Sequence, residues 1–430
     1  MSKDQSASTG TSHIPSLRHN VVALGLVNVS NYVLPLVTIP YITRVLGVEA
    51  YGKVAFAQVL VAYLILLVDY GFSWSTSRKI AANRSDRHFV SQTFVATFVA
   101  QWTLLIAAAV IGLVFILKIE RLRIDLWLYV AAFTSVIGTA LFPIWFLQGL
   151  ERLQAVATIQ VVPRLLAVVP IFFFVKVPED AIWVLVISGV GALLGGIGAI
   201  WWIQRERLID WLWPGWNAIM SELREGVGMF GSRVSISLYT TLIPLVLGWV
   251  AGPVALAYFN LADKLRRAAQ SLISPLSQAL FPRMSHLVAI RDGTAFTLIK
   301  RSFYAVLLIA GSASFGLWFL ADWLVWLMGG DEFKDAATVL RWLAPVPLII
   351  GLSNLLGVQI MIPKQMSRAF NGVLASAAAV SLLIIWPLSE FYAASGAAAT
   401  ILIIETFVTL VMTIILWRHG LLDRKNWNKQ

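Results

Sequence analysis

The strongest sign of chemistry in the sequence is a cluster of ionisable residues inside an apolar stretch: Asp263, Lys264, Arg266 and Arg267. The cluster lies about ten residues into a predicted helix, or roughly 15 Å from its start. Asp263 can pair with either arginine at i+3 or i+4, which leaves Lys264 and the other arginine uncompensated on that helix. These cations either line a hydrated cavity that binds an anion, or form a structural salt-bridge cluster with acids of neighbouring helices such as Glu405.

Three further ionisable residues interrupt apolar stretches. In a membrane, each such group costs about 2.5–3.5 kcal/mol and must therefore be paired, hydrated or functional. Arg164 stands between two largely apolar flanks, and it either lines a substrate path or pairs with Asp69 or Glu405. Asp69 is either a counterion for Arg78 or a carboxylate that binds a coupling ion. Glu405, near the middle of another predicted helix, is either an ion-pair partner or a proton or sodium site.

The composition requires these stretches to lie in lipid. The chain has 430 residues, of which 59% are hydrophobic and 13% charged, and a mean hydropathy of +0.79. Soluble domains have about 25% charged residues, so this chain has too little polar surface for water. The absence of cysteine excludes disulfides, thiolate metal sites and cysteine nucleophiles. The five histidines fall in tails and helix boundaries, and we expect neither a metal nor a cofactor.

Long apolar windows predict an all-α, polytopic membrane protein with about twelve transmembrane helices in two six-helix lobes. Twenty of the 33 Lys and Arg residues fall in the two termini and the connections on the same side as them, and eight in the connections on the other side, so we expect both termini in the cytoplasm. The expected organisation is a polar tail (1–20), a first lobe (21–203), an interfacial linker (204–226), a second lobe (227–417) and a C-terminal tail (418–430).

A weak internal repeat relates the two predicted lobes. An offset of 205 residues aligns Gly47 with Gly252, Ala50 with Ala255 and Ala57 with Ala262. Because six helices per copy is an even number, the two copies share one orientation and are related by a pseudo-twofold axis along the membrane normal. The same offset pairs Asn28 with Arg233, which predicts polar groups at equivalent points facing a path between the lobes. Snorkelling to the inner membrane surface is the alternative for Arg233.

Three segments of the sequence resemble a known family. They are residues 31–47 (NYVLPLVTIPYITRVLG) with Tyr51 and Gly52, residues 68–72 (VDYGF) with Arg78, and residues 262–264 (ADK) with 274–283 (SPLSQALFPR). They are similar to Wzx-type flippases of O-antigen and exopolysaccharide repeat units. The resemblance implies the fold of the multidrug/oligosaccharidyl-lipid/polysaccharide (MOP) exporter superfamily and a place in the bacterial inner membrane. It also implies alternating access, in which an undecaprenyl-pyrophosphate-linked oligosaccharide moves from the cytoplasmic to the periplasmic leaflet.

Carried over to this sequence, the resemblance predicts a cationic substrate site. Its expected cavity residues are Arg164, Arg233, Lys264, Arg266 and Arg267, with Asn28 and Asn260 as donors and acceptors for sugars. Arginine side chains can bind the oxygens of a pyrophosphate bidentately. Transport is driven either by the membrane potential or by proton or sodium coupling through Asp69 or Glu405.

The expected partners are the lipid-linked glycan, the lipid bilayer and the polysaccharide polymerase and chain-length machinery, with no nucleic acid. A drug or cation exporter of the same superfamily is the main alternative, but it would need an acidic cavity. A membrane-embedded polymerase or glycosyltransferase would need a sizeable outer loop, and the predicted outer loops are short. We therefore expect a transporter and not an enzyme.

Overall fold

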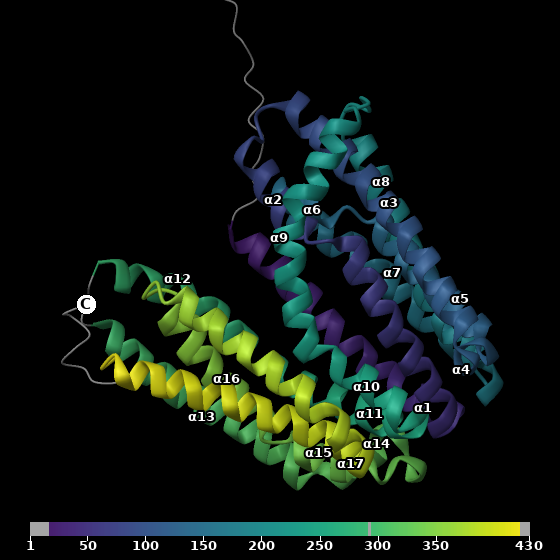
Figure 1. Cartoon of the computed structure of the whole chain (residues 1–430), viewed down its shortest axis with the longest axis vertical. Coiled ribbons are helices and arrows are strands. Elements are labelled where there is room, and N and C mark those ends of the chain that lie inside the picture. The colour runs from purple at the N-terminus through teal and green to yellow at the C-terminus, as the bar shows by residue number, and fades with distance from the viewer. Residues whose placement is uncertain (1–16, 291–293, 422–430) are drawn as a thin grey trace, which may run out of the picture.

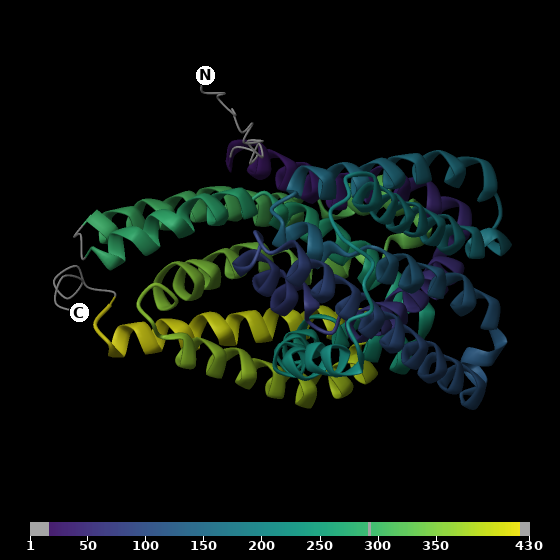
Figure 2. The same cartoon turned by 90° about the horizontal axis from the view of Figure 1, so that it is seen from above.

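The computed structural model describes residues 17–290 and 294–421, with side chains from Pro35 onward apart from several positions in two helices of the second lobe. The regular elements of the described chain are all helices, and they form two arms that meet at one end, like a V (Figure 1). In the view from above, the first arm (purple to teal) lies on the right and the second (green to yellow) on the left (Figure 2). We call the end where the arms meet the apex.

The first arm is built from eight helices and one 3-10 turn. These are α1 (Leu17–Asp69), α2 (Phe72–Ala82), α3 (Arg87–Lys118), α4 (Glu120–Ile124), α5 (Leu126–Leu141), α6 (Ile144–Gly149), α7 (Leu153–Phe174), η1 (Pro178–Asp180) and α8 (Ala181–Arg205).

The second arm follows a connection of ten residues without helix. Its elements are α9 (Trp216–Thr240), α10 (Leu242–Val250), α11 (Gly252–Ser271), α12 (Ser274–Ala289), α13 (Thr294–Phe319), α14 (Ala321–Gly329), η2 (Asp331–Phe333), α15 (Ala336–Leu343), α16 (Val346–Leu356), the π-helical turn η3 (Gly357–Met361) and α17 (Ser367–Arg418). Because α9 begins at Trp216, the second half of the expected linker is the start of a helix. The uncharged residues 234–262 belong to three helices, since α9 ends at Thr240, α10 ends at Val250 and α11 begins at Gly252.

The described helices account for the expected number of membrane crossings. Eight segments are long and apolar enough to span a membrane. Two of them, around α1 and α17, turn back at a residue with non-helical backbone, Gly47 and Ala393, and so provide two crossings each. The pairs α9–α10 and α11–α12, which are not among the eight apolar segments, add two more segments of membrane length. The described chain therefore contains twelve membrane-length segments, six in each arm, as the sequence predicts.

The backbone supports the predicted repeat. Gly47 and Gly252 both have positive φ, +69° and +86°, and each directly precedes or begins a helix at the apex. Positive φ is unstrained only for glycine, which explains why both copies have this residue at the turn. Gly52 faces the backbone of Pro253 so closely that a methyl group there would overlap the Pro253 carbonyl. The first turns of the equivalent helices thus pack directly against each other across the two arms.

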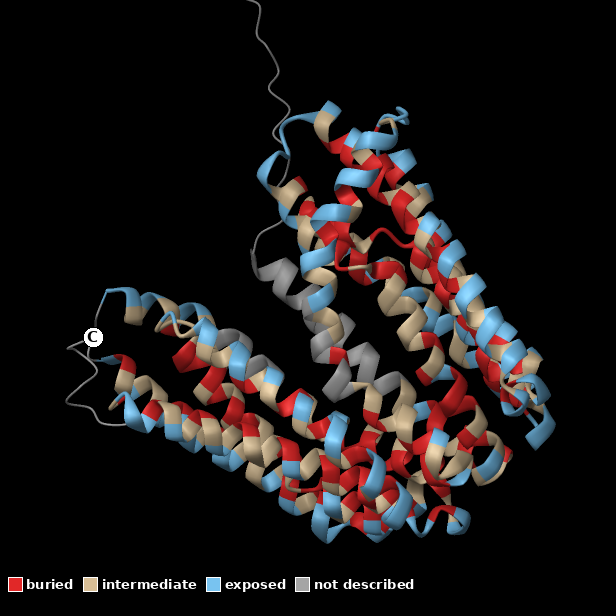
Figure 3. Cartoon of the chain, viewed as in Figure 1, coloured by how far each residue is buried: buried red, intermediate tan, exposed pale blue. Residues whose placement is uncertain are grey.

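Packing is concentrated at the apex and between the helices of each arm. Buried residues gather in both places, whereas the outward faces of the arms are exposed (Figure 3). The exposed faces are apolar; on α3, Ile106, Val110 and Phe115 are all more than half exposed. Such faces are stable only against lipid. Helix α9 lies between the arms and contacts α2 and α3 of the first and α17 of the second (Figure 1).

Candidate functional site

The charged cluster on α11 is organised around one carboxylate. Asp263 is buried and accepts hydrogen bonds from Nε of Arg266 at 2.7 Å and from Nε of Arg267 at 2.6 Å. The Nη1 atom of Arg266 donates to Gln270 at 2.6 Å. The sequence predicts that Asp263 pairs with one arginine only; in the structure it pairs with both, because residues at i+3 and i+4 lie on the same helix face. A single acid therefore compensates two bases, and Lys264 points elsewhere.

Lys264 reaches across to the first arm. Its Nζ donates to the hydroxyl of Tyr51 at 3.1 Å, and the ammonium lies 5.3 Å from the centre of the Tyr51 ring. The Tyr51 hydroxyl in turn donates to Oδ1 of Asn260 at 2.9 Å. Tyr51 is only 3% exposed and its ring packs edge-on against Phe333. A chain of hydrogen bonds thus joins α1 to α11 across the two arms and fixes the position of the Lys264 ammonium.

A cavity of about 400 Å³ opens beside this chain, and we call it the cation cavity. It is formed by α1, α7 and α8 of the first arm and by Lys264 of the second. Arg164 also lines it, together with the polar side chains of Thr38, Gln58 and Ser188. None of the lining residues is acidic, so the wall of the cavity carries two cationic side chains and no carboxylate. A site of this kind favours an anionic ligand.

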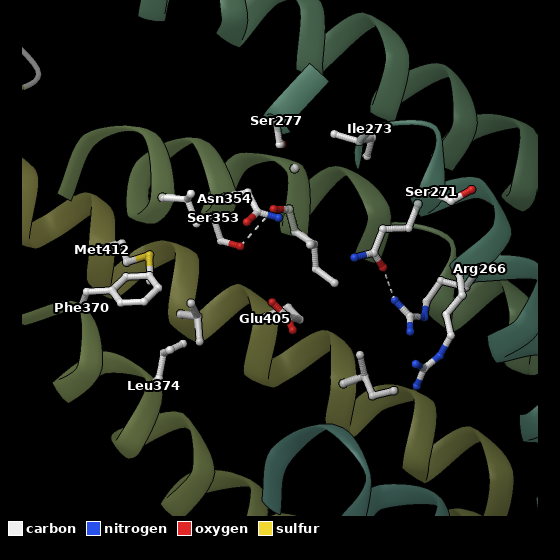
Figure 4. Close-up of a pocket in the computed structure, with 17 residues that line it drawn as sticks. Arg266, Ser271, Ile273, Ser277, Ser353, Asn354, Phe370, Leu374, Glu405 and Met412 are labelled. Carbon is white, nitrogen blue, oxygen red and sulfur yellow. Dashed lines mark hydrogen bonds between the residues drawn. The ribbon is translucent and has the colours of Figure 1, made fainter. Parts of the chain in front are cut away.

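A second cavity of about 530 Å³ lies inside the second arm, and we call it the Glu405 cavity. Arg266 and Arg267 line one end, and the Glu405 carboxylate points into it from α17 (Figure 4). Asn354 lies on the opposite wall, on α16 just before the π-helical turn η3. Among the described residues, no base lies within 4 Å of the Glu405 carboxylate, so the expected ion pair with Arg164 or the α11 arginines does not form.

Asp69 and Arg233 form an ion pair outside both cavities. Asp69 at the end of α1 is buried, pairs with Arg233 on α9 and also accepts a hydrogen bond from Ser73 at 2.6 Å. The Arg233 guanidinium lies 5.7 Å from the ring centre of Trp74. The expected partner Arg78 is instead exposed. Because Arg233 and Asp69 form an ion pair, neither is an isolated charge in this conformation.

The start of α9 forms a second set of contacts with the first arm. Lys79 donates to Glu222 at 2.6 Å and to Glu225 at 3.2 Å, and Thr76 donates to Glu222 at 3.4 Å. Tyr70 stacks on Phe230 with their ring centres 4.8 Å apart. Burial raises the pKa of Glu222 above its ordinary range although Lys79 lies beside it. The first half of α9 is thus bound to the first arm.

The predicted site residues therefore separate into three places. Arg164, Lys264 and Asn260 lie at or beside the cation cavity, Arg266, Arg267 and Glu405 at the Glu405 cavity, and Arg233 and Asp69 in the α9 ion pair. The side chain of Asn28 lies outside the described residues. Sequence reasoning missed Tyr51 as a site residue. Its place in the repeat, directly before Gly52 in the first turn of a helix that faces the other arm, is a signal that could have found it.

Comparison with known proteins agrees with this architecture. Residues 17–288 match the model of a family described as polysaccharide biosynthesis protein. The chain belongs to this family. It is 33% identical over 415 residues to a protein of Escherichia coli (strain K12) named "Putative O-antigen transporter", covering 95% of this chain and 98% of that one. A protein of the same name from Shigella dysenteriae is 30% identical over 396 residues, covering 92% and 99%.

Solved structures place this member of the polysaccharide biosynthesis family in the MOP fold. A structure described as the inward-facing conformation of a multidrug resistance MATE family transporter of the MOP superfamily has a TM-score of 0.74 at 15% identity, covering 96% of this chain and 99% of that one. The inward closed conformation of the lipid II flippase MurJ has a TM-score of 0.65 at 12% identity, covering 93% and 87%. Together with its apolar helices, these relations identify a multi-pass inner-membrane protein. Its relatives are named as transporters and not as enzymes.

Proposed function

We propose that this MOP-superfamily protein is a flippase for lipid-linked oligosaccharides, and that its substrate is an undecaprenyl-pyrophosphate-linked repeat unit. The observation that carries the proposal is the cation cavity, where Arg164 and Lys264 line a space without an acidic residue between elements of both arms. The names of its relatives, O-antigen transporters, support the same class of cargo. A glycan headgroup enters this space while the lipid tail stays in the bilayer.

The two cations have different chemistry toward a pyrophosphate. The planar guanidinium of Arg164 can hold two phosphate oxygens at once, whereas the ammonium of Lys264 acts as a point charge. Tyr51 lines the same cavity and acts as a positioning residue, because its hydroxyl holds Lys264 in place. Gln58 and Ser188 supply donors and acceptors for sugar hydroxyls. We place Arg266 and Arg267 in a supporting role, because Asp263 compensates them.

We further propose that the open ends of the V face the cytoplasm. Twenty of the 33 Lys and Arg residues belong to the termini and the connections on their side. The last turn of α17 lies at the open end of the second arm (Figure 1). In this orientation, residues 1–20, 204–226 and 418–430 lie on the cytoplasmic side, and lobes over residues 21–203 and 227–417 rock about the apex.

Two energy sources fit the proposed cycle. Outward movement of one negative charge across an inside-negative membrane is favoured by about 2.3 kcal/mol per 100 mV, so a pyrophosphate can be driven by the potential alone. The Glu405 cavity supports proton coupling instead, because its carboxylate has no basic partner within 4 Å among the described residues. Asp69 is less suited to either proton or sodium coupling, because it is engaged by Arg233.

The same fold also occurs in multidrug transporters, which makes export of cationic drugs the rival function. The charge of the cavity argues against it. A lipophilic cation entering the cation cavity would meet Arg164 and Lys264 with no carboxylate in the wall. Like charges in a site of low dielectric repel strongly.

The test uses proteoliposomes that contain labelled undecaprenyl-pyrophosphate oligosaccharide and an imposed potential. Wild type should move the labelled lipid across the bilayer, and an Arg164→Gln/Lys264→Gln variant should lose most of this movement. Lys334→Gln is the matched control, because this exposed lysine lies outside both cavities. Equal movement by the double variant and wild type would refute the cavity assignment. Export of a lipophilic cation, without glycan movement, would establish the rival function.

A further inference from the structure

Two arginines of the first arm each hold the end of a helix in the second arm. Arg44 on α1 donates from Nη2 to the carbonyl oxygens of Trp326 at 3.3 Å and Leu327 at 3.1 Å, in the last turn of α14. Arg121 on α4 donates to the carbonyl oxygens of Trp249 at 2.9 Å and Gly248 at 3.3 Å, in the last turn of α10. Both contacts lie at the apex and join one arm to the other.

The two contacts are related by the internal repeat. The offset of 205 residues that relates Gly47 to Gly252 also relates Arg44 to Trp249 and Arg121 to Trp326. The contact of Arg44 with Trp326 is therefore the pseudo-twofold counterpart of the contact of Arg121 with Trp249. Arg44 binds the carbonyl of Trp326, which is the repeat equivalent of Arg121. Arg121 in turn binds the carbonyl of Trp249, which is the repeat equivalent of Arg44. The sequence identity of the repeat is weak, yet the contact is formed twice in the same way.

The chemistry of the contacts suits repeated opening and closing. The last carbonyls of a helix lack intrahelical donors and carry its partial negative charge, so a guanidinium binds them favourably. Each arginine also lies close to a glycine of positive φ that follows the helix it binds. Gly330, after α14, lies beside Arg44, and Gly252, after α10, lies beside Arg121. Both arginines are exposed, and among the described residues neither has a carboxylate within 4 Å. When the arms separate, water can hydrogen-bond to both the guanidinium groups and the helix carbonyls.

We propose that Arg44 and Arg121 form a symmetric latch that closes the periplasmic side of the substrate path and opens once per transport cycle. The proposal rests on the orientation given under the proposed function, in which the apex faces the periplasm. Thr43 supports its location, since this buried residue donates to the carbonyl of Met328 at 2.5 Å directly beside the Arg44 contact. Loss of the latch should raise the fraction of molecules that are open at the apex.

The expected size follows from the strength of a cation at a helix C-terminus. Removal of one arginine should shift the ratio of open to closed apex about two- to five-fold. Because the two contacts share no residue, their effects should multiply to about four- to twenty-five-fold. Lysine in place of each arginine should keep part of the effect, because an ammonium also binds helix carbonyls but lacks the fork of the guanidinium.

The experiment measures opening directly and needs no glycan. The natural chain has no cysteine, so Thr43→Cys provides a single thiol at a position that is 1% exposed. Its labelling by a membrane-impermeant maleimide is followed in spheroplasts, which expose the periplasmic face, and in inverted vesicles. Arg44→Gln/Arg121→Gln should speed labelling in spheroplasts about four- to twenty-five-fold, with each single variant in between wild type and the double variant. Arg123→Gln, which removes an exposed arginine from the same short helix α4, is the matched control.

Labelling of the double variant at the rate of the Arg123→Gln control would overturn the latch. Faster labelling only in inverted vesicles would also overturn it, because the apex would then face the cytoplasm. A thermal melt of each variant checks that the fold is kept, and the Arg44→Lys/Arg121→Lys variant provides a second comparison with the charge retained. Faster periplasmic labelling together with no glycan movement by wild type would support the latch while refuting the proposed substrate.

Discussion

Replacement of Tyr51 by phenylalanine tests the link between the cation cavity and the contact of the two arms. The variant keeps the ring that packs against Phe333 and removes only the hydroxyl, which bonds both Asn260 and Lys264. A neutral hydrogen bond is worth about 0.5–1.5 kcal/mol and one to a charged group about 1.5–3 kcal/mol. Lys264 is partly exposed in the cavity, where water can replace the Tyr51 hydroxyl as its partner. Most of the free energy of the hydrogen bond to the charged Lys264 should therefore be kept.

We therefore expect Tyr51→Phe to weaken the inter-arm contact by about 1–2 kcal/mol, which is roughly a five- to thirty-fold change in an equilibrium constant. The apparent affinity for the lipid-linked oligosaccharide should fall by a similar factor, because Lys264 is no longer held in one position. Proteoliposome transport at several substrate concentrations measures this effect. Tyr258→Phe is the control, since it removes a tyrosine hydroxyl from α11, the helix of Asn260 and Lys264, at an exposed contact with the Glu332 carbonyl. Wild-type affinity in Tyr51→Phe, with the control also unchanged, would refute the positioning role.

Three other predictions concern the acidic residues Glu222, Asp69 and Glu405. Lys79→Met should destabilise the protein, and more at pH 8 than at pH 5. Burial raises the pKa of Glu222 above 4.5, and without Lys79 the ionised carboxylate that prevails at high pH has lost its closest basic partner. Thermal melts should show that adding Glu222→Gln restores most of the lost stability. Asp69→Asn should lower stability by about 3 kcal/mol, since it leaves Arg233 unpaired; an unchanged melting temperature would contradict this. Glu405→Gln should keep the fold but abolish any dependence of transport on a proton gradient, and a retained dependence would exclude Glu405 as the coupling site.

The general architecture could be predicted from the sequence because lipid imposes strong rules. Apolar windows of about twenty residues can only be membrane helices, so the number of crossings follows from composition and length. The aligned Gly47 and Gly252 located two equivalent turns, since few residues other than glycine adopt positive φ. The pairing of Asp263 with nearby arginines also followed from helical spacing.

The distribution of the charges over separate cavities could not be predicted in this way. Successive residues of α11 point in different directions, so Lys264 faces the first arm while Arg266 and Arg267 line the second cavity. Periodicity gives these relative directions but not the helices that lie opposite. The pairing of Asp69 with Arg233 is similarly a contact between distant parts of the chain. Such contacts depend on how the arms are set against each other, which no local pattern encodes.

Because the two arms meet at one end, a small rotation there moves their open ends by a larger distance. A helix of 26 residues such as α13 is about 39 Å long, so a tilt of about 10° at the apex moves its far end by roughly 7 Å. Under the proposed function, such an opening can admit headgroups that differ by several sugar rings, and selectivity then rests on the pyrophosphate link that they share.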